Sequence, residues 1–218
     1  MNIDAIQEDF FQIREDLRAV KRKGKWGMID FNLNILAPFE YDFIGRFSDD
    51  RSPAQKGEKW GYLDSTGKEV IPFRYSQVKS FYHGVAMVYK DDRCALIDIH
   101  ENELTPFIYE ASRKFTEGFV CVKKNNHYGV INTKGEEVVP CIYSYIADFS
   151  EGRAIVENDE KYGCIDQSGK IVIPIEYQYI CDFSGGTVVV KNDGKWGRID
   201  RWGKVLVPCK YTSCDEVP

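Results

Sequence analysis

A repeat of 34 residues governs this sequence. An aromatic–glycine pair occurs at residues 26–27, 60–61, 128–129, 162–163 and 196–197, and Cys94-Ala95 fills the same position of the remaining copy. The prolines that keep this spacing are Pro38, Pro72, Pro106, Pro140, Pro174 and Pro208. A fixed period of about 20 to 50 residues indicates a tandem-repeat architecture. Residues that every copy shares are then explained most simply by the scaffold, so function is to be sought where the copies differ.

Each copy predicts three or four short strands. Residues 187–200 combine a β-branched run, an Asn-Asp-Gly turn and a second short run, which indicates a hairpin. Residues 200–203 begin with Asp and end with Gly, which suits a type I turn. A third strand follows, and Pro208 is expected to interrupt its ladder because proline lacks the N–H donor. A last short stretch leads to the next copy, and nothing in the array indicates a helix.

One such copy buries too little surface to be stable alone, so neighbouring copies must pack together. We expect three rings per copy to fill this interface, and the glycine after the aromatic to permit a bulge or a close backbone approach. The predicted fold is all-β, with six units in a propeller-like ring; an open β-solenoid or superhelix is the alternative. Residues 18–218 form the array, with breaks near residues 51, 85, 119, 153 and 187. Residues 1–17 form a lead-in whose apolar positions also fit a capping helix: Ile6, Phe10, Phe11, Ile13 and Leu17.

Composition narrows the class of protein. The net charge is -5 with acids and bases interspersed, which argues against an electrostatic nucleic-acid binder. No apolar run reaches membrane-spanning length, and the acidic N-terminus is unlike a secretion signal, so we expect a cytoplasmic protein without a membrane partner. The 7 cysteines include no CxxC pair and replace small buried hydrophobic residues, which predicts neither a disulfide framework nor a zinc site.

The repeated motif resembles the bacterial WG (Trp-Gly) repeat family. The motif reads KWGMID, KWGYLD, YGVIN, YGCID and KWGRID, and is followed by a glycine-containing turn, a strand with proline, a tyrosine and Asp-x-Phe-x-x-Gly. The resemblance covers about nine-tenths of the chain. Copy three departs from it, because RCALID replaces both the aromatic and the glycine, and its local geometry is therefore in doubt. The resemblance implies a β-rich repetitive protein and carries over no catalytic residue.

The positions of the candidate catalytic and metal-binding residues in the repeat indicate that they serve the scaffold. The aspartates of the repeated turn are interpreted as turn formers whose carboxylates hold backbone amides: Asp30, Asp64, Asp98, Asp166 and Asp200. His83, His100 and His127 fall in three different phases of the repeat, as expected of surface residues rather than metal ligands. No nucleophile or phosphate-binding motif occurs. We therefore predict that the protein is not an enzyme and holds neither a cofactor nor a metal.

Two features are candidate binding sites. In all six copies a basic or potentially basic residue precedes the aromatic–glycine position: Lys25, Lys59, Arg93, His127, Lys161 and Lys195. These residues predict either a basic stripe that attracts an anion or an acidic partner, or local ion pairs. Trp202 and Tyr82 stand where other copies carry small or polar residues, which suggests contact anchors or variation on a tolerant loop.

The functional hypothesis is a non-enzymatic protein-binding scaffold, with an immunity, antitoxin-like or adaptor role as more specific versions. The alternative is a lectin-like module that binds a small ligand or glycan in one equivalent pocket per repeat.

Overall fold

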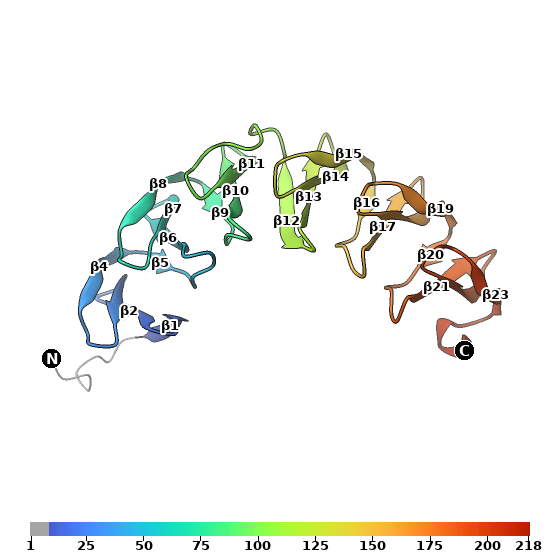
Figure 1. The fold of residues 1–218 in the computed structure, drawn as a ribbon, viewed down its shortest axis with the longest axis horizontal. Coiled ribbons are helices and arrows are strands. Elements are labelled where there is room, and N and C mark those ends of the chain that lie inside the picture. Colours follow the sequence, from blue (N-terminus) through green and yellow to red (C-terminus); the bar gives the residue numbers. More distant parts are fainter. Residues whose placement is uncertain (1–8) are drawn as a thin grey trace. The chain divides into compact units, whose positions relative to one another are not determined.

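The computed structural model describes residues 9–218, which form two compact units. The first unit extends to Ile108 and the second covers Tyr109–Pro218. Each unit contains three small antiparallel sheets, numbered here 1 to 6 in chain order (Figure 1). The predicted all-β array of six tandem sheets is confirmed. Closure into a ring, as opposed to an open superhelix, stays a prediction.

In the first unit, sheets 1 and 2 have four strands each and sheet 3 has three. The strands of sheet 1 are β1 (Phe10–Arg14), β2 (Leu17–Arg22), β3 (Lys25–Asp30) and β4 (Ile35–Tyr41). Sheet 2 contains β5 (Phe43–Ile44), β6 (Ser52–Lys56), β7 (Lys59–Leu63) and β8 (Glu69–Tyr75). Sheet 3 contains β9 (Gln77–Val78), β10 (Val85–Lys90) and β11 (Arg93–Asp98).

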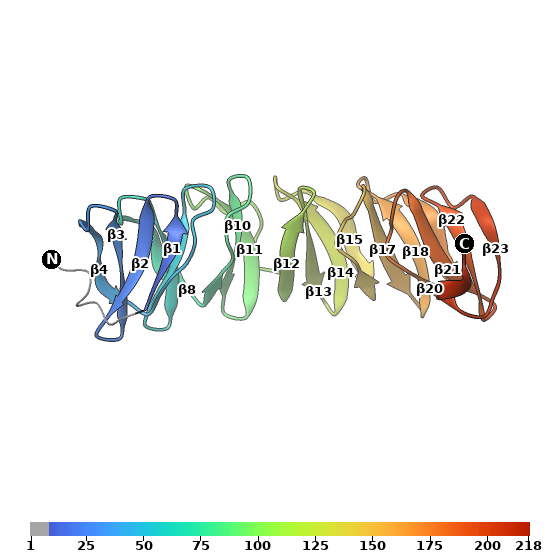
Figure 2. The same ribbon diagram turned by 90° about the horizontal axis from the view of Figure 1, so that it is seen from below.

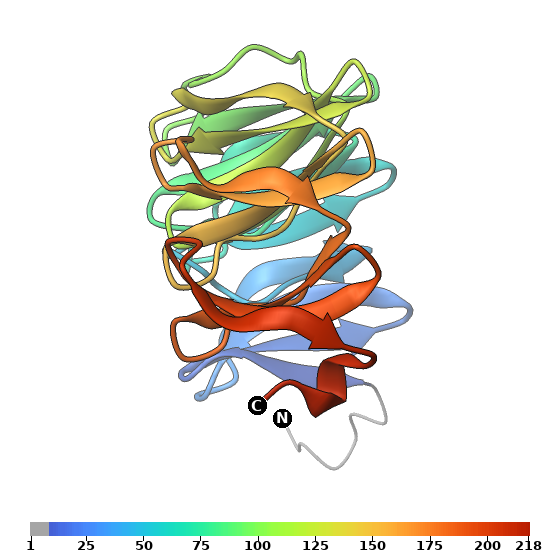
Figure 3. The same ribbon diagram turned by 90° about the vertical axis from the view of Figure 1, so that its right-hand side faces the viewer.

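In the second unit all three sheets have four strands, each pairing with the next in the chain (Figure 2). Sheet 4 contains β12 (Ala111–Thr116), β13 (Phe119–Lys124), β14 (His127–Asn132) and β15 (Glu137–Tyr143). Sheet 5 contains β16 (Tyr145–Ile146), β17 (Arg153–Asn158), β18 (Lys161–Asp166) and β19 (Ile171–Tyr177). Sheet 6 contains β20 (Tyr179–Ile180), β21 (Thr187–Asn192), β22 (Lys195–Asp200) and β23 (Val205–Tyr211). A short 3₁₀ helix, Cys214–Glu216, follows β23 (Figure 3).

The sheets begin one strand earlier than the sequence copies. The expected breaks near residues 51, 85, 119, 153 and 187 lie at or next to the start of the second strand of sheets 2 to 6, because the preceding copy supplies the first strand. The lead-in supplies β1 (Phe10–Arg14) to sheet 1, so the helical alternative is wrong for those residues; Ile6 lies outside the described residues. Pro208 lies within β23, at the edge of its sheet, so the strand continues past the proline that was expected to interrupt it.

The glycine of the pair lets the fourth strand approach the third. A Cβ on Gly163 would lie 2.7 Å from the carbonyl oxygen of Ile173 on β19, and the other four copies show similarly close approaches. In copy three this glycine is Ala95, and sheet 3 lacks a fourth strand in the described chain; the following segment meets β11 through the isolated bridge Ile97–Glu103 and a hydrogen bond from the Leu104 N–H to the carbonyl oxygen of Leu96. The doubt about the local geometry of this copy is thereby confirmed and has a steric reason.

The three repeated rings differ in burial. The tyrosines are buried in five copies, as Tyr41, Tyr75, Tyr109, Tyr143 and Tyr177. Tyr41 contacts Phe73 of the next sheet at a centroid distance of 5.6 Å, which confirms packing between copies. The aromatic of the aromatic–glycine pair is half-buried, as at Trp26 and Trp196, and it also contacts neighbouring copies, as Trp60 contacts Phe43 at a centroid distance of 5.5 Å.

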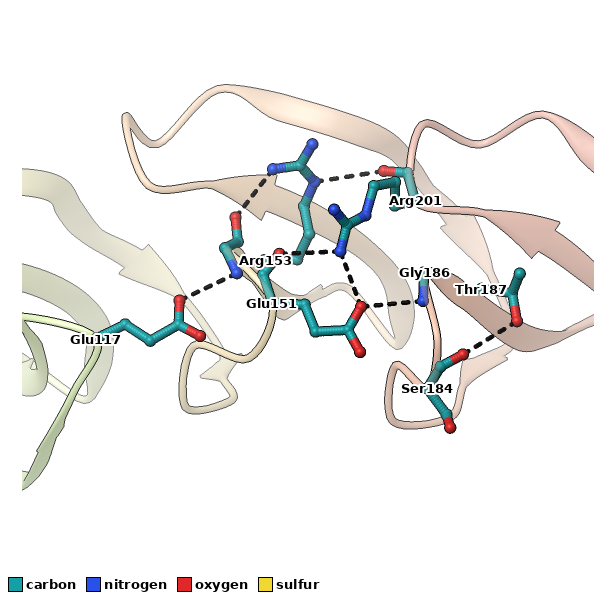
Figure 4. A network of polar contacts seen from close by, with 8 residues as sticks. Glu117, Glu151, Arg153, Ser184, Gly186, Thr187 and Arg201 are labelled. Carbon is teal, nitrogen blue, oxygen red and sulfur yellow. Dashed lines mark hydrogen bonds and ion pairs between the residues drawn. The ribbon is translucent and has the colours of Figure 1, made fainter.

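A carboxylate in a turn of sheet 5 joins that sheet to sheet 6. Glu151 Oε2 accepts hydrogen bonds from the backbone N–H of Gly186 at 3.0 Å and from Nη2 of Arg201 at 2.8 Å (Figure 4). Arg153 Nε donates in the same region to the carbonyl oxygen of Arg201 at 3.3 Å. We call the contact of Glu151 with Gly186 and Arg201 the turn clamp.

Two further pairs of sheets carry the same kind of contact. Glu117 Oε2 accepts from the backbone N–H of Gly152 at 3.0 Å and from Nε2 of Gln167 at 3.1 Å. In the first unit, Asp49 Oδ2 accepts from the backbone N–H of Gly84 at 2.8 Å. An acidic residue in one turn thus satisfies a backbone donor in the next sheet, which fixes the spacing between sheets within each unit.

No helix among the described residues is long and apolar enough to cross a membrane.

Candidate binding surface

The six basic or potentially basic residues that precede the aromatic–glycine position are called the basic row here. Each begins the third strand of a sheet, and their contacts differ. Lys25 Nζ lies 2.5 Å from Oδ1 of Asp42, and its hydrogen bond holds the pKa of that carboxyl below its usual range. His127 Nδ1 lies 2.9 Å from the carbonyl oxygen of Asn125. Local ion pairing, one of the two alternatives, therefore describes Lys25, whereas His127 contacts a backbone carbonyl and not an acid.

The other members of the row differ from these two. Arg93 Nη1 donates to the carbonyl oxygen of Ile108 at 3.4 Å. Lys59, Lys161 and Lys195 are exposed and form no ion pair within residues 9–218. These three lysines are thus available to a partner.

The two aromatic candidates lie in different units. Trp202 is 68% exposed in the turn before β23, and its backbone N–H donates to Oδ1 of Asp200 at 2.9 Å. Val205 and Leu206, which follow it, are also exposed, so the start of β23 presents apolar surface. Tyr82 is only half-exposed and packs edge-on against the ring of His83, with centroids 4.3 Å apart. Trp202 therefore fits a contact anchor better than Tyr82 does.

A line of half-exposed and exposed rings runs across the three sheets of the second unit. We call it the aromatic ladder; its members are Tyr128, Tyr145, Tyr162, Tyr179 and Trp196. Tyr179 lies between two of the others, with its ring centroid 5.7 Å from that of Tyr162 and 5.9 Å from that of Trp196. Arg113 joins the remaining two, its guanidinium carbon lying 5.6 Å from the Tyr128 centroid and 4.9 Å from that of Tyr145.

Cations lie against both ends of the ladder. Lys123 Nζ is 5.8 Å from the ring centroid of Tyr128, and Lys191 Nζ is 5.6 Å from that of Trp196. A cation within about 6 Å of an aromatic face is attracted by the negative face of the ring. These contacts favour fixed positions for the two end rings of the ladder.

An open surface pocket of 510 Å³ lies at the sheet 6 end of the ladder. Its lining combines two rings, an amide, a cation and a turn glycine, from Gln178, Tyr179, Lys191, Gly194 and Trp196. Gln178 Oε1 accepts a hydrogen bond from the backbone N–H of Gly194 at 2.7 Å, which fixes the orientation of the side-chain amide. Partly apolar pockets with a few convergent polar groups are the usual setting for ligand binding.

Sequence reasoning missed Tyr145 and Tyr179, which belong to the stretch that connects two copies. One signal would have found them: the ladder residues are spaced by half the repeat, at positions 128, 145, 162, 179 and 196. This half-repeat series of aromatic residues is complete only in copies whose connecting stretch carries an aromatic residue at the position of Tyr145 and Tyr179. In the first unit the corresponding residues are Phe43 and Gln77, of which only Phe43 packs on a neighbouring ring, that of Trp60 at 5.5 Å.

The turn aspartates have the role that the sequence predicted. Oδ1 of Asp166 accepts from the side-chain hydroxyl of Ser168 at 2.6 Å and from the backbone N–H groups of Ser168 and Lys170. The hydrogen bond from the Ser168 hydroxyl is the main reason that the pKa of Asp166 lies below its usual value, and the two amides lower it further. These carboxylates are occupied in holding turns.

The three histidines are exposed, as predicted. Within residues 9–218, no group of three or more His, Cys, Asp or Glu side chains is placed to hold a metal ion.

Comparison with known proteins agrees with this architecture. The family model of the WG containing repeat matches residues 26–60, 60–94, 96–127, 128–162 and 162–196. No curated protein matches the chain.

Solved structures similar to this chain are β-propeller proteins. A eukaryotic initiation factor is 12% identical over 94% of this chain and 67% of that chain, with a TM-score of 0.50. Hsv2p of Kluyveromyces lactis is 11% identical over 88% of this chain and 73% of that chain, with a TM-score of 0.44. The N-terminal domain of Nup159 is 11% identical over 93% of this chain and 75% of that chain, with a TM-score of 0.43. At such identities the likeness concerns the fold alone. Because the family model matches five tandem copies over most of the sequence, the chain belongs to the family of WG containing repeat proteins.

Proposed function

We propose that this protein is a non-enzymatic scaffold that binds another protein through the aromatic ladder of its second unit. The observation that carries the proposal is the ladder itself, in which ring–ring and cation–ring contacts hold aromatic side chains at the surface. Tyrosine and tryptophan dominate the energetics of protein interfaces because they offer large contact area at a small entropic cost.

The arrangement of the ladder favours a protein partner over the lectin-like alternative. A module with one equivalent pocket per repeat needs the same pocket residues in each copy. At the position of Tyr179, however, other copies carry Gln77 or Ala111. A surface that is built where the copies differ suits the recognition of one particular partner.

A comparison of ladder and control variants tests the proposal. A partner is captured from the native host by cross-linking, identified, purified and titrated calorimetrically against the wild type, Tyr179→Ala and Tyr145→Ala. Both tyrosines are exposed and lie in short edge strands, so the folded state tolerates their truncation. Loss of an interface hot spot costs about 2 kcal/mol, which corresponds to a roughly thirtyfold weaker affinity.

Ile171→Ala is the matched control, because Ile171 is a 50% exposed apolar residue on β19 of the same unit. Its affinity is expected to equal that of the wild type. Trp202→Ala tests the other exposed aromatic site in parallel. If the partner binds Tyr179→Ala and Tyr145→Ala as tightly as the wild type, the ladder is not the binding surface. If only a glycan is retained from the host, the binding class is wrong.

A further inference from the structure

The rings at the sheet 6 end of the ladder form a notch with inclined walls. The ring planes of Tyr179 and Trp196 meet at 72°, and those of Tyr162 and Tyr179 at 56°. Lys191 lies against the ring of Trp196. Because the centroids lie only 5.7 and 5.9 Å apart, the rings touch one another and leave an angled corner beside them. A compact apolar group can pack into this corner against the ring faces.

The notch presents hydrogen-bond donors that have no partner within the described residues. These are Nε1 of Trp196, the hydroxyl of Tyr179 and Nε2 of Gln178, whose Oε1 is already engaged by the backbone of Gly194. An indole N–H is a donor only, and the amide nitrogen carries two N–H groups. A ligand that fits the notch must therefore supply several acceptors next to its apolar groups.

The hairpins of sheets 5 and 6 carry charges of both signs. Lys161, Lys191 and Lys195 lie close in sequence to the hairpin-turn carboxylates of Asp159, Glu160 and Asp193. A polyanion such as a nucleic acid gains little from a surface of mixed sign, since its binding depends on an excess of cations. The complementary ligand is an uncharged segment that is rich in acceptors.

A proline-rich segment has these properties. In the polyproline II conformation the backbone makes no internal hydrogen bonds, so its carbonyl oxygens are free to accept, and its pyrrolidine rings are compact and apolar. The conformation is largely formed before binding, and such segments dock in aromatic-lined grooves.

We infer that the notch formed by Tyr179, Trp196 and Gln178 binds a proline-rich, polyproline II segment of another protein. The inference rests on the proposed function, because it specifies the partner of the aromatic ladder. The prolines pack into the corner beside the two touching rings, against their exposed faces, and the segment's carbonyl oxygens accept from the three donors.

Fluorescence anisotropy with a fluorescein-labelled deca-proline peptide tests the inference on the full chain. The wild type is expected to bind the peptide saturably, and a glycine–serine decamer with the same label should not bind. Tyr179→Ala and Gln178→Ala are each expected to weaken binding by about thirtyfold, as for truncation of an interface hot spot. Tyr179→Phe should retain part of the affinity because it keeps the ring and loses only the hydroxyl, and Ile171→Ala should bind like the wild type.

Circular dichroism shows whether each variant is folded, and Gln178→Ala replaces Tyr179→Ala if the latter is not. Absence of saturable deca-proline binding by the folded wild type overturns the inference, as does equal binding of the glycine–serine peptide or an unchanged affinity of both alanine variants. Saturable binding of cellohexaose or oligo(dT) in place of deca-proline also overturns it. If Tyr179→Ala weakens binding of the purified host partner while deca-proline does not bind the wild type, the inference fails and the proposed function stands. If deca-proline binds but the partner is indifferent to Tyr179 and Tyr145, the proposed function fails instead.

Discussion

The turn clamp is expected to stabilise the junction of sheets 5 and 6 measurably. Glu151→Ala removes the acceptor of both the Gly186 amide and the Arg201 guanidinium. A hydrogen bond to a backbone amide contributes about 1 kcal/mol. The ion pair joins side chains that are 31% and 34% exposed, so solvent screening limits it to about 0.5 kcal/mol. We expect Glu151→Ala to lower the free energy of unfolding by about 1.5 kcal/mol.

Urea unfolding followed by tryptophan fluorescence measures this loss, with Glu176→Ala as the matched control. Glu176 is an exposed glutamate on β19 for which no hydrogen bond or ion pair occurs within the described residues. Glu151→Gln retains an oxygen acceptor for the Gly186 amide and loses the charge, so its expected cost is about 0.5 kcal/mol. Added salt should reduce only the part of this stability loss that comes from the ion pair with Arg201. If Glu151→Ala and Glu176→Ala agree within about 0.3 kcal/mol, the clamp does not stabilise the fold and the reasoning is refuted.

Four further predictions concern three individual residues and the closure of the array. Gly163→Ala should cost about 1–3 kcal/mol and speed amide exchange in β19, because the new Cβ would lie 2.7 Å from the carbonyl oxygen of Ile173; an unchanged free energy of unfolding would contradict this. Burial raises the pKa of Cys164 to about 12, so its thiol should resist Ellman's reagent at pH 8 until the protein unfolds, and rapid labelling of the native protein at this residue would disprove the assignment. The pKa of Asp166 in the folded protein lies below the ordinary value of 3.8, so its contribution to stability is present above that pH and is lost as the pH falls through the folded value; acid titration of Asp166→Asn should show a smaller loss, and an identical profile would count against the turn-forming role. Solution scattering should give a radius of gyration of about 17 Å if the array closes into a compact ring, whereas an elongated profile would support the open superhelix.

The sequence was sufficient for every feature that depends on a few neighbouring residues. The hairpin of residues 187–200 formed as predicted, since its turn and β-branched strands are local properties. The turn carboxylate of Asp166 and the close approach at Gly163 were predicted for the same reason. Copy three shows the converse, because the replacement of glycine by Ala95 marks the sheet whose fourth strand is missing from the described chain.

The period itself could not show where a sheet begins. A repeat of 34 residues has no intrinsic origin, so the same spacing is compatible with sheets that start at any strand. In the structure each of sheets 2 to 6 takes its first strand from the preceding copy, as β20 (Tyr179–Ile180) joins β21 (Thr187–Asn192). The breaks in the sequence and the boundaries of the sheets therefore differ by one strand.

The turn clamp and the contacts between the ladder rings were decided by the tertiary structure, although the half-repeat spacing marks the ladder residues in the sequence. Glu151 and Arg201 are separated by 50 residues, and no local pattern indicates that their side chains meet. Tyr179 reads as part of a connecting stretch, yet it lies between Tyr162 of one sheet and Trp196 of the next. Propensity and hydrophobic pattern report the local backbone and its buried face. Contacts between sheets depend instead on how far apart and at what angle packing places them, and that distance is set only when the copies fold against one another.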